Sequence, residues 1–122
     1  LTAGEKFDMI VDVEADELAM DIPFDPKLVI VDVRKTNEFA GGHITDAINI
    51  PVSEMMDPAS MVNLEDSHNI YVHCAGGYRS VIACSLIKRQ GIHNIYNVLG
   101  GWTRMQEMKE KFTIEKTTEV LN

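Results

Sequence analysis

Five short apolar runs rich in β-branched residues, separated by segments of helical pattern, constrain the fold of this chain more than any other feature. The runs are MIVDV, LVIVDV, AINI, NIYVHC and NIYNV, at residues 9–13, 28–33, 47–50, 69–74 and 94–98. Continuous apolar strands of this length are typical of a sheet that is buried on both faces. Their alternation with helices predicts an α/β domain with a mainly parallel sheet.

The segments between the runs are each predicted to form a helix or a helical turn, at residues 14–22, 36–42, 51–66, 78–91 and 100–111. Thr36 is a suitable N-cap for the second of them. Pro51 is predicted to open the third, and Pro58 to split it into two short pieces. Gly91 follows a basic last turn and is predicted to end the fourth.

The length of 122 residues indicates one domain with a single core. We expect the core to span residues about 9–110, and the segments 1–8 and 112–122, the latter a polar tail, to be loose termini. The chain begins with Leu1 rather than Met. We therefore expect either a processed protein or a fragment of a larger one, for instance a domain fused to a hydrolase.

Composition argues against several classes of protein. The longest apolar runs, at residues 28–31 and 81–84, are far shorter than the roughly 20 residues that cross a bilayer, so no membrane contact is expected. No signal-peptide pattern is found at the start of the chain. Two cysteines are too few for a disulfide framework, which favours a reducing cytoplasm. The histidines and cysteines lack zinc-site spacing, and neither a metal nor a cofactor is expected.

Charge is distributed unevenly along the chain. The net charge of −8 argues against nucleic acid as a partner. Residues 1–66 hold 15 acidic and 4 basic side chains, whereas residues 67–122 hold 4 acidic and 7 basic. An anion would therefore be better tolerated by the second half.

Cys74 is the strongest candidate for a functional residue. It ends a predicted strand, and Ala75, Gly76 and Gly77 follow it before a helix that starts near Tyr78. Ligands of open α/β sheets lie at such strand ends, and small residues allow successive N–H groups to face inward as an anion-binding nest. Amides and a helix N-terminus lower a cysteine pKa, which predicts a nucleophilic thiolate. The alternative is a cysteine that only fills space, but packing alone would not require the glycines.

Cys84 has the opposite interpretation. It lies in the middle of a predicted apolar helix, about two turns from the loop, so we interpret it as a core residue rather than a resolving thiol.

The loop and its surroundings contain five short motifs in a fixed order, namely DVR (32–34), EFAGGHI (38–44), AINIP (47–51), CAGGYRS (74–80) and NVLGGW (97–102). In these pieces the chain resembles the rhodanese family of sulfurtransferases. Each piece alone is weak, but together they span residues about 9–110 in a specific order and spacing. The resemblance implies a three-layer rhodanese-like domain, a five-stranded parallel sheet flanked by helices.

The resemblance also implies an activity, namely transfer of sulfane sulfur through a persulfide on Cys74. The donor would be a small persulfide, polysulfide or thiosulfate, and the acceptor a thiol or another nucleophile. The loop would hold the terminal sulfur with its backbone N–H groups, contributed by Ala75, Gly76, Gly77, Tyr78, Arg79 and Ser80.

Residues outside the loop would support it. Arg79 would orient an anionic donor or brace the loop. Asp32 and Arg34 would support the loop from the neighbouring strand end, with Glu38 as an ion-pair partner for Arg34 or, equally, a solvated surface charge.

Three further side chains are interpreted as structural. His43 is expected to fix its own turn by hydrogen bonding, His73 to be a packed neighbour rather than a general base, and Trp102 to pack in the core rather than to rim a pocket.

Two other functions remain open from the sequence. Cysteine-dependent phosphatases and arsenate reductases on this fold use a longer H-C-x5-R-[ST] loop, whereas HCAGGYRS is one residue shorter, which suits a sulfur atom better than a phosphate. A non-catalytic interaction module would retain the fold with an unreactive thiol. Because Arg79 is the only charged loop residue, a persulfide or polysulfide donor is favoured over thiosulfate.

Overall fold

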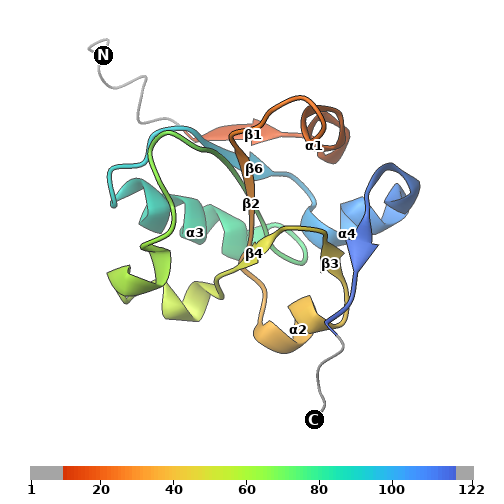
Figure 1. Cartoon of the computed structure of the whole chain (residues 1–122). Helices are drawn as coiled ribbons and strands as arrows, with labels where there is room; N and C mark the ends of the chain where they lie inside the picture. Colours follow the sequence, from red (N-terminus) through yellow and green to blue (C-terminus); the bar gives the residue numbers. More distant parts are fainter. Residues whose placement is uncertain (1–9, 118–122) are drawn as a thin grey trace.

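A computed structural model describes residues 10–117 of the chain and shows an α/β domain built on a five-stranded sheet (Figure 1). All pairings within this sheet are parallel. Its strands, in spatial order, are β1 (Val11–Val13), β6 (Ile95–Val98), β5 (Asn69–His73), β2 (Leu28–Asp32) and β4 (Ile48–Asn49). The predicted α/β class and parallel sheet are confirmed.

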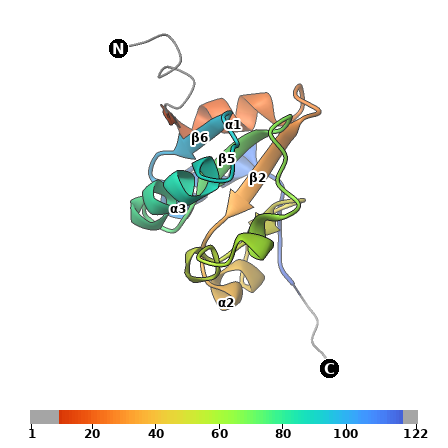
Figure 2. The ribbon, with the colours of Figure 1, turned by 90° about the vertical axis from the view of Figure 1, so that its left-hand side faces the viewer.

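Helices cover both faces of the sheet and make three layers (Figures 1 and 2). The longest helix, α3 (Tyr78–Lys88), lies on one face, and α1 (Ala15–Asp21) and α4 (Gly101–Glu107) lie on the other. Two apolar clusters correspond to these faces. Alternate residues of the central strands enter different clusters, as Ile70 and Tyr71 of β5 do, which explains why the strands read as continuous apolar runs.

The region between the fourth and fifth strands is less helical than its length suggests. It contains two short 3-10 helices, η2 (Val52–Glu54) and η3 (Pro58–Met61). Pro51 caps the first and Pro58 opens the second, so the predicted division at Pro58 is confirmed. The start of α2 (Thr36–Ala40) differs from the prediction, because Lys35 rather than Thr36 is the N-cap.

A second, two-stranded sheet was not predicted. β3 (His43–Ile44) pairs antiparallel with β7 (Ile114–Glu115), which follows the 3-10 helix η4 (Lys109–Lys111). Thr117 also donates its amide to the Ala40 carbonyl at 3.0 Å. The tail from residue 112 is therefore attached to the domain through residue 117, and the expectation of a loose segment is wrong for these residues. The rest of the predicted loose segments, residues 1–8 and 118–122, lies outside the described residues.

The carboxyl ends of β2 and β5 lie side by side. Asp32 pairs with His73 in the register of the two strands, and the Val33 amide donates to the His73 carbonyl at 3.0 Å. Residues that follow these two strands are therefore brought together at one edge of the sheet. Within residues 10–117, no helix has both the length and the apolar composition that a membrane crossing requires.

Candidate active site

Cys74 directly follows β5 and lies at the base of a short loop that leads into α3. The side chain is 1% exposed and contacts the apolar cluster on the α3 face of the sheet. Gly77 is the N-cap of α3 and has a φ of 110°, a left-handed conformation that favours glycine. The chain therefore turns sharply around the thiol before the helix begins.

The loop directs backbone N–H groups at the sulfur. The Gly77 amide donates to Cys74 Sγ at 3.0 Å. Burial alone raises the pKa of the Cys74 thiol, but hydrogen bonds from the amide and hydroxyl of Ser80 and from the amides of Gly77 and Arg79 outweigh it. The pKa of Cys74 consequently lies below the ordinary value for a thiol.

The start of α4 holds the loop from the other face of the sheet. The amides of Trp102 and Thr103 donate to the carbonyls of Cys74 and Ala75, at 2.7 Å and 3.0 Å. Gly101 makes this approach possible, because it has a φ of +55° and a Cβ there would lie 2.3 Å from the Cys74 carbonyl oxygen. Because the carbonyls of Cys74 and Ala75 bond to α4, they point away from the sulfur. The amides of Gly77, Arg79 and Ser80 can therefore face it.

Arg79 is held by an ion pair rather than left free. Its guanidinium donates to both carboxylate oxygens of Glu38 on α2, at 2.8 Å and 3.3 Å. The hydrogen bond from Arg79, with help from the Lys35 amide, lowers the pKa of Glu38 to about 2. Glu38 therefore pairs with Arg79, and the predicted pairing with Arg34 is wrong.

Arg34 pairs with Asp32 instead, in a buried network beside the loop. The Arg34 guanidinium donates to both Asp32 oxygens, with contacts as short as 2.7 Å, and to the Gly42 carbonyl at 2.7 Å. It also lies over the Trp102 ring, 4.4 Å from the centroid. Both charged side chains are almost completely buried, so their mutual pairing leaves neither of them as an unpaired buried charge.

The remaining polar candidates have packing contacts. The His73 ring is fully buried, lies near Trp102, and has Nε2 3.6 Å from an Asp32 oxygen; burial lowers the pKa of His73. His43 Nδ1 bonds the Phe39 carbonyl at 2.7 Å and so fixes its own turn, as predicted. Cys84 is fully buried on α3, in agreement with its interpretation as a core residue.

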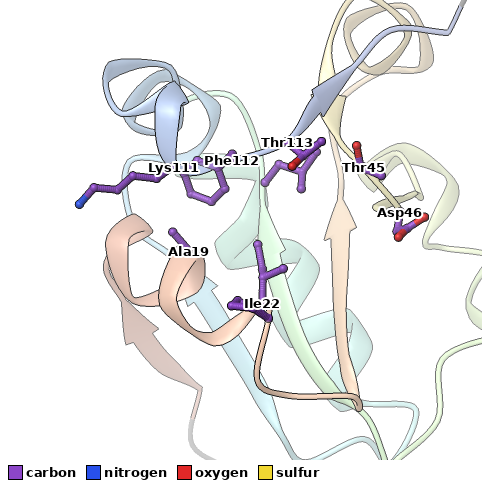
Figure 3. Close-up of a pocket in the computed structure, with 9 residues that line it drawn as sticks. Ala19, Ile22, Thr45, Asp46, Lys111, Phe112 and Thr113 are labelled. Carbon is purple, nitrogen blue, oxygen red and sulfur yellow. The ribbon is translucent and has the colours of Figure 1, made fainter.

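One hollow on the described surface does not adjoin Cys74. It measures about 370 Å³ and lies between α1, the residues after β3 and the segment that leads into β7 (Figure 3). Its lining has no cysteine or histidine. A second hollow of about 310 Å³ is lined by Gly77 and lies next to the loop. We therefore place the candidate chemistry at the loop.

The family of the chain follows from comparison with known proteins. A family model described as "Rhodanese-like domain" matches residues 14–108, most of the chain. The chain belongs to the rhodanese-like domain family. The resemblance of the five motif pieces to this family is thereby confirmed.

Individual relatives agree with this assignment. The Bacillus subtilis protein YqhL is 35% identical over 78 residues, 64% of this chain and 60% of YqhL. YrkF from the same organism is 31% identical over 108 residues, 86% of this chain. A protein named "Sulfurtransferase" from Allochromatium vinosum is 27% identical over 99 residues, 79% of this chain and 91% of that protein. The chain thus spans only 60% of YqhL and 57% of YrkF.

A solved structure matches over nearly the whole rhodanese-like domain. The solution structure of a rhodanese-like domain from Anabaena superposes with a TM-score of 0.76 at 26% identity, and covers 93% of this chain and 89% of that one. The three-layer arrangement is therefore that of rhodanese-like domains.

Sequence reasoning about this rhodanese-like domain missed one part of the site, the start of α4. The signal was present in NVLGGW, where two adjacent glycines precede an aromatic residue at the end of a strand. A glycine pair indicates close backbone approach as well as a turn. Which loop it approaches could not be read without the order of the strands.

Among the described residues no group of three or more histidine, cysteine or acidic side chains could hold a metal ion.

The two thiols of the rhodanese-like domain are expected to differ in reactivity. The thiolate is the nucleophile, so the rate of alkylation of Cys74 by iodoacetamide should rise with pH. The rate should reach half its maximum at a pH below about 8.5, which is the pKa of a free cysteine. The low exposure of Cys74 reduces the absolute rate but not this midpoint. Burial, with the Asp12 charge, raises the pKa of Cys84 to about 12, so Cys84 should stay unmodified in the folded protein.

Peptide mapping after timed alkylation across a pH series measures both thiols in one sample. A Cys74 midpoint at or above that of free cysteine would contradict the hydrogen-bonded environment of its sulfur.

Proposed function

We propose that this rhodanese-like domain is a sulfurtransferase that carries sulfane sulfur as a persulfide on Cys74. The observation that supports this most is the geometry of the thiol, which lies at the base of a loop with an amide 3.0 Å from Sγ and a lowered pKa. The relative named "Sulfurtransferase" supports the same chemistry at the level of the family.

In the first half-reaction, the Cys74 thiolate attacks the sulfane sulfur of the donor. A new S–S bond forms on Cys74, and the bond between that sulfur and the donor breaks. The rest of the donor molecule leaves with the electron pair. It leaves as a thiolate from a persulfide, as a shortened chain from a polysulfide, or as sulfite from thiosulfate. The exchange needs no external oxidant or reductant.

In the second half-reaction, an acceptor nucleophile attacks the outer sulfur. The S–S bond to Cys74 breaks, and Cys74 leaves as a thiolate, which its hydrogen bonds stabilise. The outer sulfur carries negative charge before the attack, and the N–H groups of residues 75–80 are the donors proposed to hold it. The acceptor is a thiol or another nucleophile.

The charges near the loop bear on the choice of donor. Arg79 is the charged residue of the loop, and its pairing with Glu38 neutralises most of its field. A dianion such as thiosulfate therefore gains little attraction at this site compared with a persulfide or polysulfide. We propose the latter two as the better donors.

The buried residues beside the loop are proposed to position it. Arg34 pairs with Asp32 and lies over the Trp102 ring, and the Trp102 amide donates to the Cys74 carbonyl. Arg79 is proposed to brace the loop against α2 through Glu38.

The proposed compartment is the cytoplasm, where reducing conditions keep Cys74 available as a thiolate.

Mass spectrometry tests the proposal directly. After exposure to glutathione persulfide or inorganic polysulfide, removal of excess donor and digestion without reductant, we expect the Cys74 peptide to be heavier by one sulfur. The Cys84 peptide should be unchanged, because that thiol is buried and its pKa is raised. Addition of a thiol acceptor should remove the sulfur. An unmodified Cys74 peptide with all donors would reject the proposal.

A phosphatase assay checks the main rival chemistry. The loop from Cys74 to Arg79 has four intervening residues, one fewer than the phosphatase pattern. We therefore expect no hydrolysis of an aryl phosphate above the background given by the Cys74→Ser variant.

A further inference from the structure

α3 has apolar side chains on both of its faces. The buried face consists of Ser80, Ala83, Cys84 and Ile87. On the outer face, Tyr78, Val81 and Ile82 are 87%, 54% and 59% exposed. Residues three and four apart share one face of a helix, so these three side chains form a continuous apolar stripe that starts at the loop around Cys74.

The stripe continues across the hollow next to the loop. This hollow of about 310 Å³ is lined by Val81 from α3 and by Leu99 from the turn before α4. Gly77 lines it too, and the Gly77 amide is the one that contacts the sulfur of Cys74. Apolar surface and sulfur site therefore adjoin each other. Soluble proteins rarely expose continuous apolar surface without an interaction to cover it.

One corner of the hollow lacks a hydrogen-bond donor. Asp12 is exposed there and accepts a bond of 3.0 Å from Asn97 Nδ2. In the part of the chain that the structure describes, no lysine, arginine or histidine pairs with Asp12. The Oδ1 atom of Asn97, a buried residue, has no hydrogen-bond partner among the same residues. This corner therefore has acceptor capacity that the described chain leaves unused.

We infer that the sulfur acceptor is a protein, and that its cysteine arrives on an apolar surface beside a basic side chain. We call the receiving area the docking surface, and it consists of Tyr78, Val81, Ile82, Leu99 and Asp12. The inference rests on the proposed sulfur transfer and specifies its acceptor. Apolar and aromatic side chains with few charges are typical of the centre of a protein interface, and a lysine or arginine is the complement of Asp12.

A small thiol fits this surface less well than a protein does. A small thiol such as glutathione has little apolar surface with which to cover Tyr78, Val81 and Ile82. It is also too short to cover a stripe that begins at residue 78 and continues into the next turn of α3. A protein segment covers the stripe while its cysteine faces the loop.

The chemical step on the docked protein is balanced. The acceptor cysteine thiolate attacks the outer sulfur of the Cys74 persulfide and becomes a persulfide itself. The S–S bond to Cys74 breaks, and Cys74 takes the electron pair and returns to the thiolate.

Two synthetic peptides test the docking surface. Both carry one cysteine flanked by leucines, and they differ only at one neighbouring position, which is arginine in one and glutamate in the other. Binding is measured by calorimetry on the Cys74→Ser protein, so that no transfer takes place. We expect the arginine peptide to bind about tenfold more tightly, and most of this preference to vanish in an Asp12→Asn variant.

Exposed apolar residues elsewhere provide the matched control. A Val81→Ser, Ile82→Ser double variant should weaken binding of both peptides about tenfold or more. Phe24 is 84% exposed, and it follows α1, which lies on the opposite face of the sheet, so Phe24→Ser should leave binding unchanged. Equal binding of the two peptides to the Cys74→Ser protein, both with and without Asp12→Asn, would overturn the proposal.

A second copy of the chain is the other occupant that the experiment distinguishes. Sedimentation of the native protein that shows a dimer, lost in the Val81→Ser, Ile82→Ser variant, would assign the surface to self-association and overturn the proposal. Sulfur loading of Cys74 is measured separately by mass spectrometry. If Cys74 takes up no sulfur, the proposed function is refuted. The peptide affinities would still show whether the docking surface binds a protein segment.

Discussion

The Cys74→Ser variant is expected to keep the fold and to lose sulfur transfer. The serine hydroxyl is close in size to the thiol, and the Gly77 amide that donates to Sγ can donate to an oxygen instead. A hydroxyl in this position is not ionised at neutral pH and cannot form a persulfide. Loss of the nucleophile in a covalent mechanism removes most of the catalysis, so turnover should fall by about 1000-fold or more.

Initial rates with a persulfide donor and a thiol acceptor measure this loss, and thermal unfolding checks the fold. The matched control is Cys84→Ala, which removes the other thiol of the chain. Cys84 lies on the buried face of α3, so its loss should lower the free energy of unfolding by about 1–2 kcal/mol while turnover persists. Undiminished turnover in Cys74→Ser would rule out the persulfide route.

The same variant separates an enzyme from an interaction module. A module that only binds a partner would be indifferent to oxygen in place of sulfur at position 74, because the shape and the surface remain the same. If the domain is an enzyme, the Cys74→Ser variant would still bind its partners but would leave them chemically unchanged.

The fold could be predicted from the sequence because its strands are buried on both faces. The runs at 28–33 and 69–74 are long, continuous and apolar, and they became the neighbouring strands β2 and β5. Cys74 at the end of the second run was placed correctly at the carboxyl edge of the sheet, since that placement depends on local sequence alone.

The partners of the charged residues could not be predicted in the same way. The sequence offered two equal interpretations of Glu38, a pairing with Arg34, four residues away, or a solvated surface charge, whereas Glu38 pairs with Arg79, 41 residues away. Sequence distance favours local pairs, but the order of the strands brings α2 to the start of α3. The pairing of β7 with β3 was missed for a similar reason, because two-residue strands carry no periodic signal.

The Gly101→Ala variant is expected to disrupt the loop around Cys74 without touching the thiol itself. A Cβ at residue 101 would lie 2.3 Å from the Cys74 carbonyl oxygen and 2.9 Å from that of Ala75. Both contacts are with backbone atoms, which cannot swing aside as a side chain can. Alanine at a φ of +55° adds strain of about 1–2 kcal/mol.

To relieve these contacts, α4 must retreat from the loop. The amides of Trp102 and Thr103 then lose the carbonyls of Cys74 and Ala75, at about 1 kcal/mol for each bond. Strain and lost bonds together should lower the free energy of unfolding by roughly 3 kcal/mol or more. Freed carbonyls can rotate toward the sulfur, which turns the neighbouring amides away and raises the pKa of Cys74. We therefore expect sulfur transfer at neutral pH to fall about tenfold or more.

Denaturant unfolding and the alkylation midpoint of Cys74 measure the two effects separately, and two other glycines act as controls. Gly91 has a φ of +87° and open space around it, so Gly91→Ala carries the strain of a left-handed alanine without a clash. Gly76 lies in the loop with nothing within 4 Å of its added Cβ, so Gly76→Ala should leave the midpoint unchanged. If Gly101→Ala unfolds like Gly91→Ala and keeps the native midpoint, α4 does not set the acidity of the thiol. A raised midpoint in Gly101→Ala alone would mean that contact between backbones on opposite faces of the sheet controls the reactivity of Cys74.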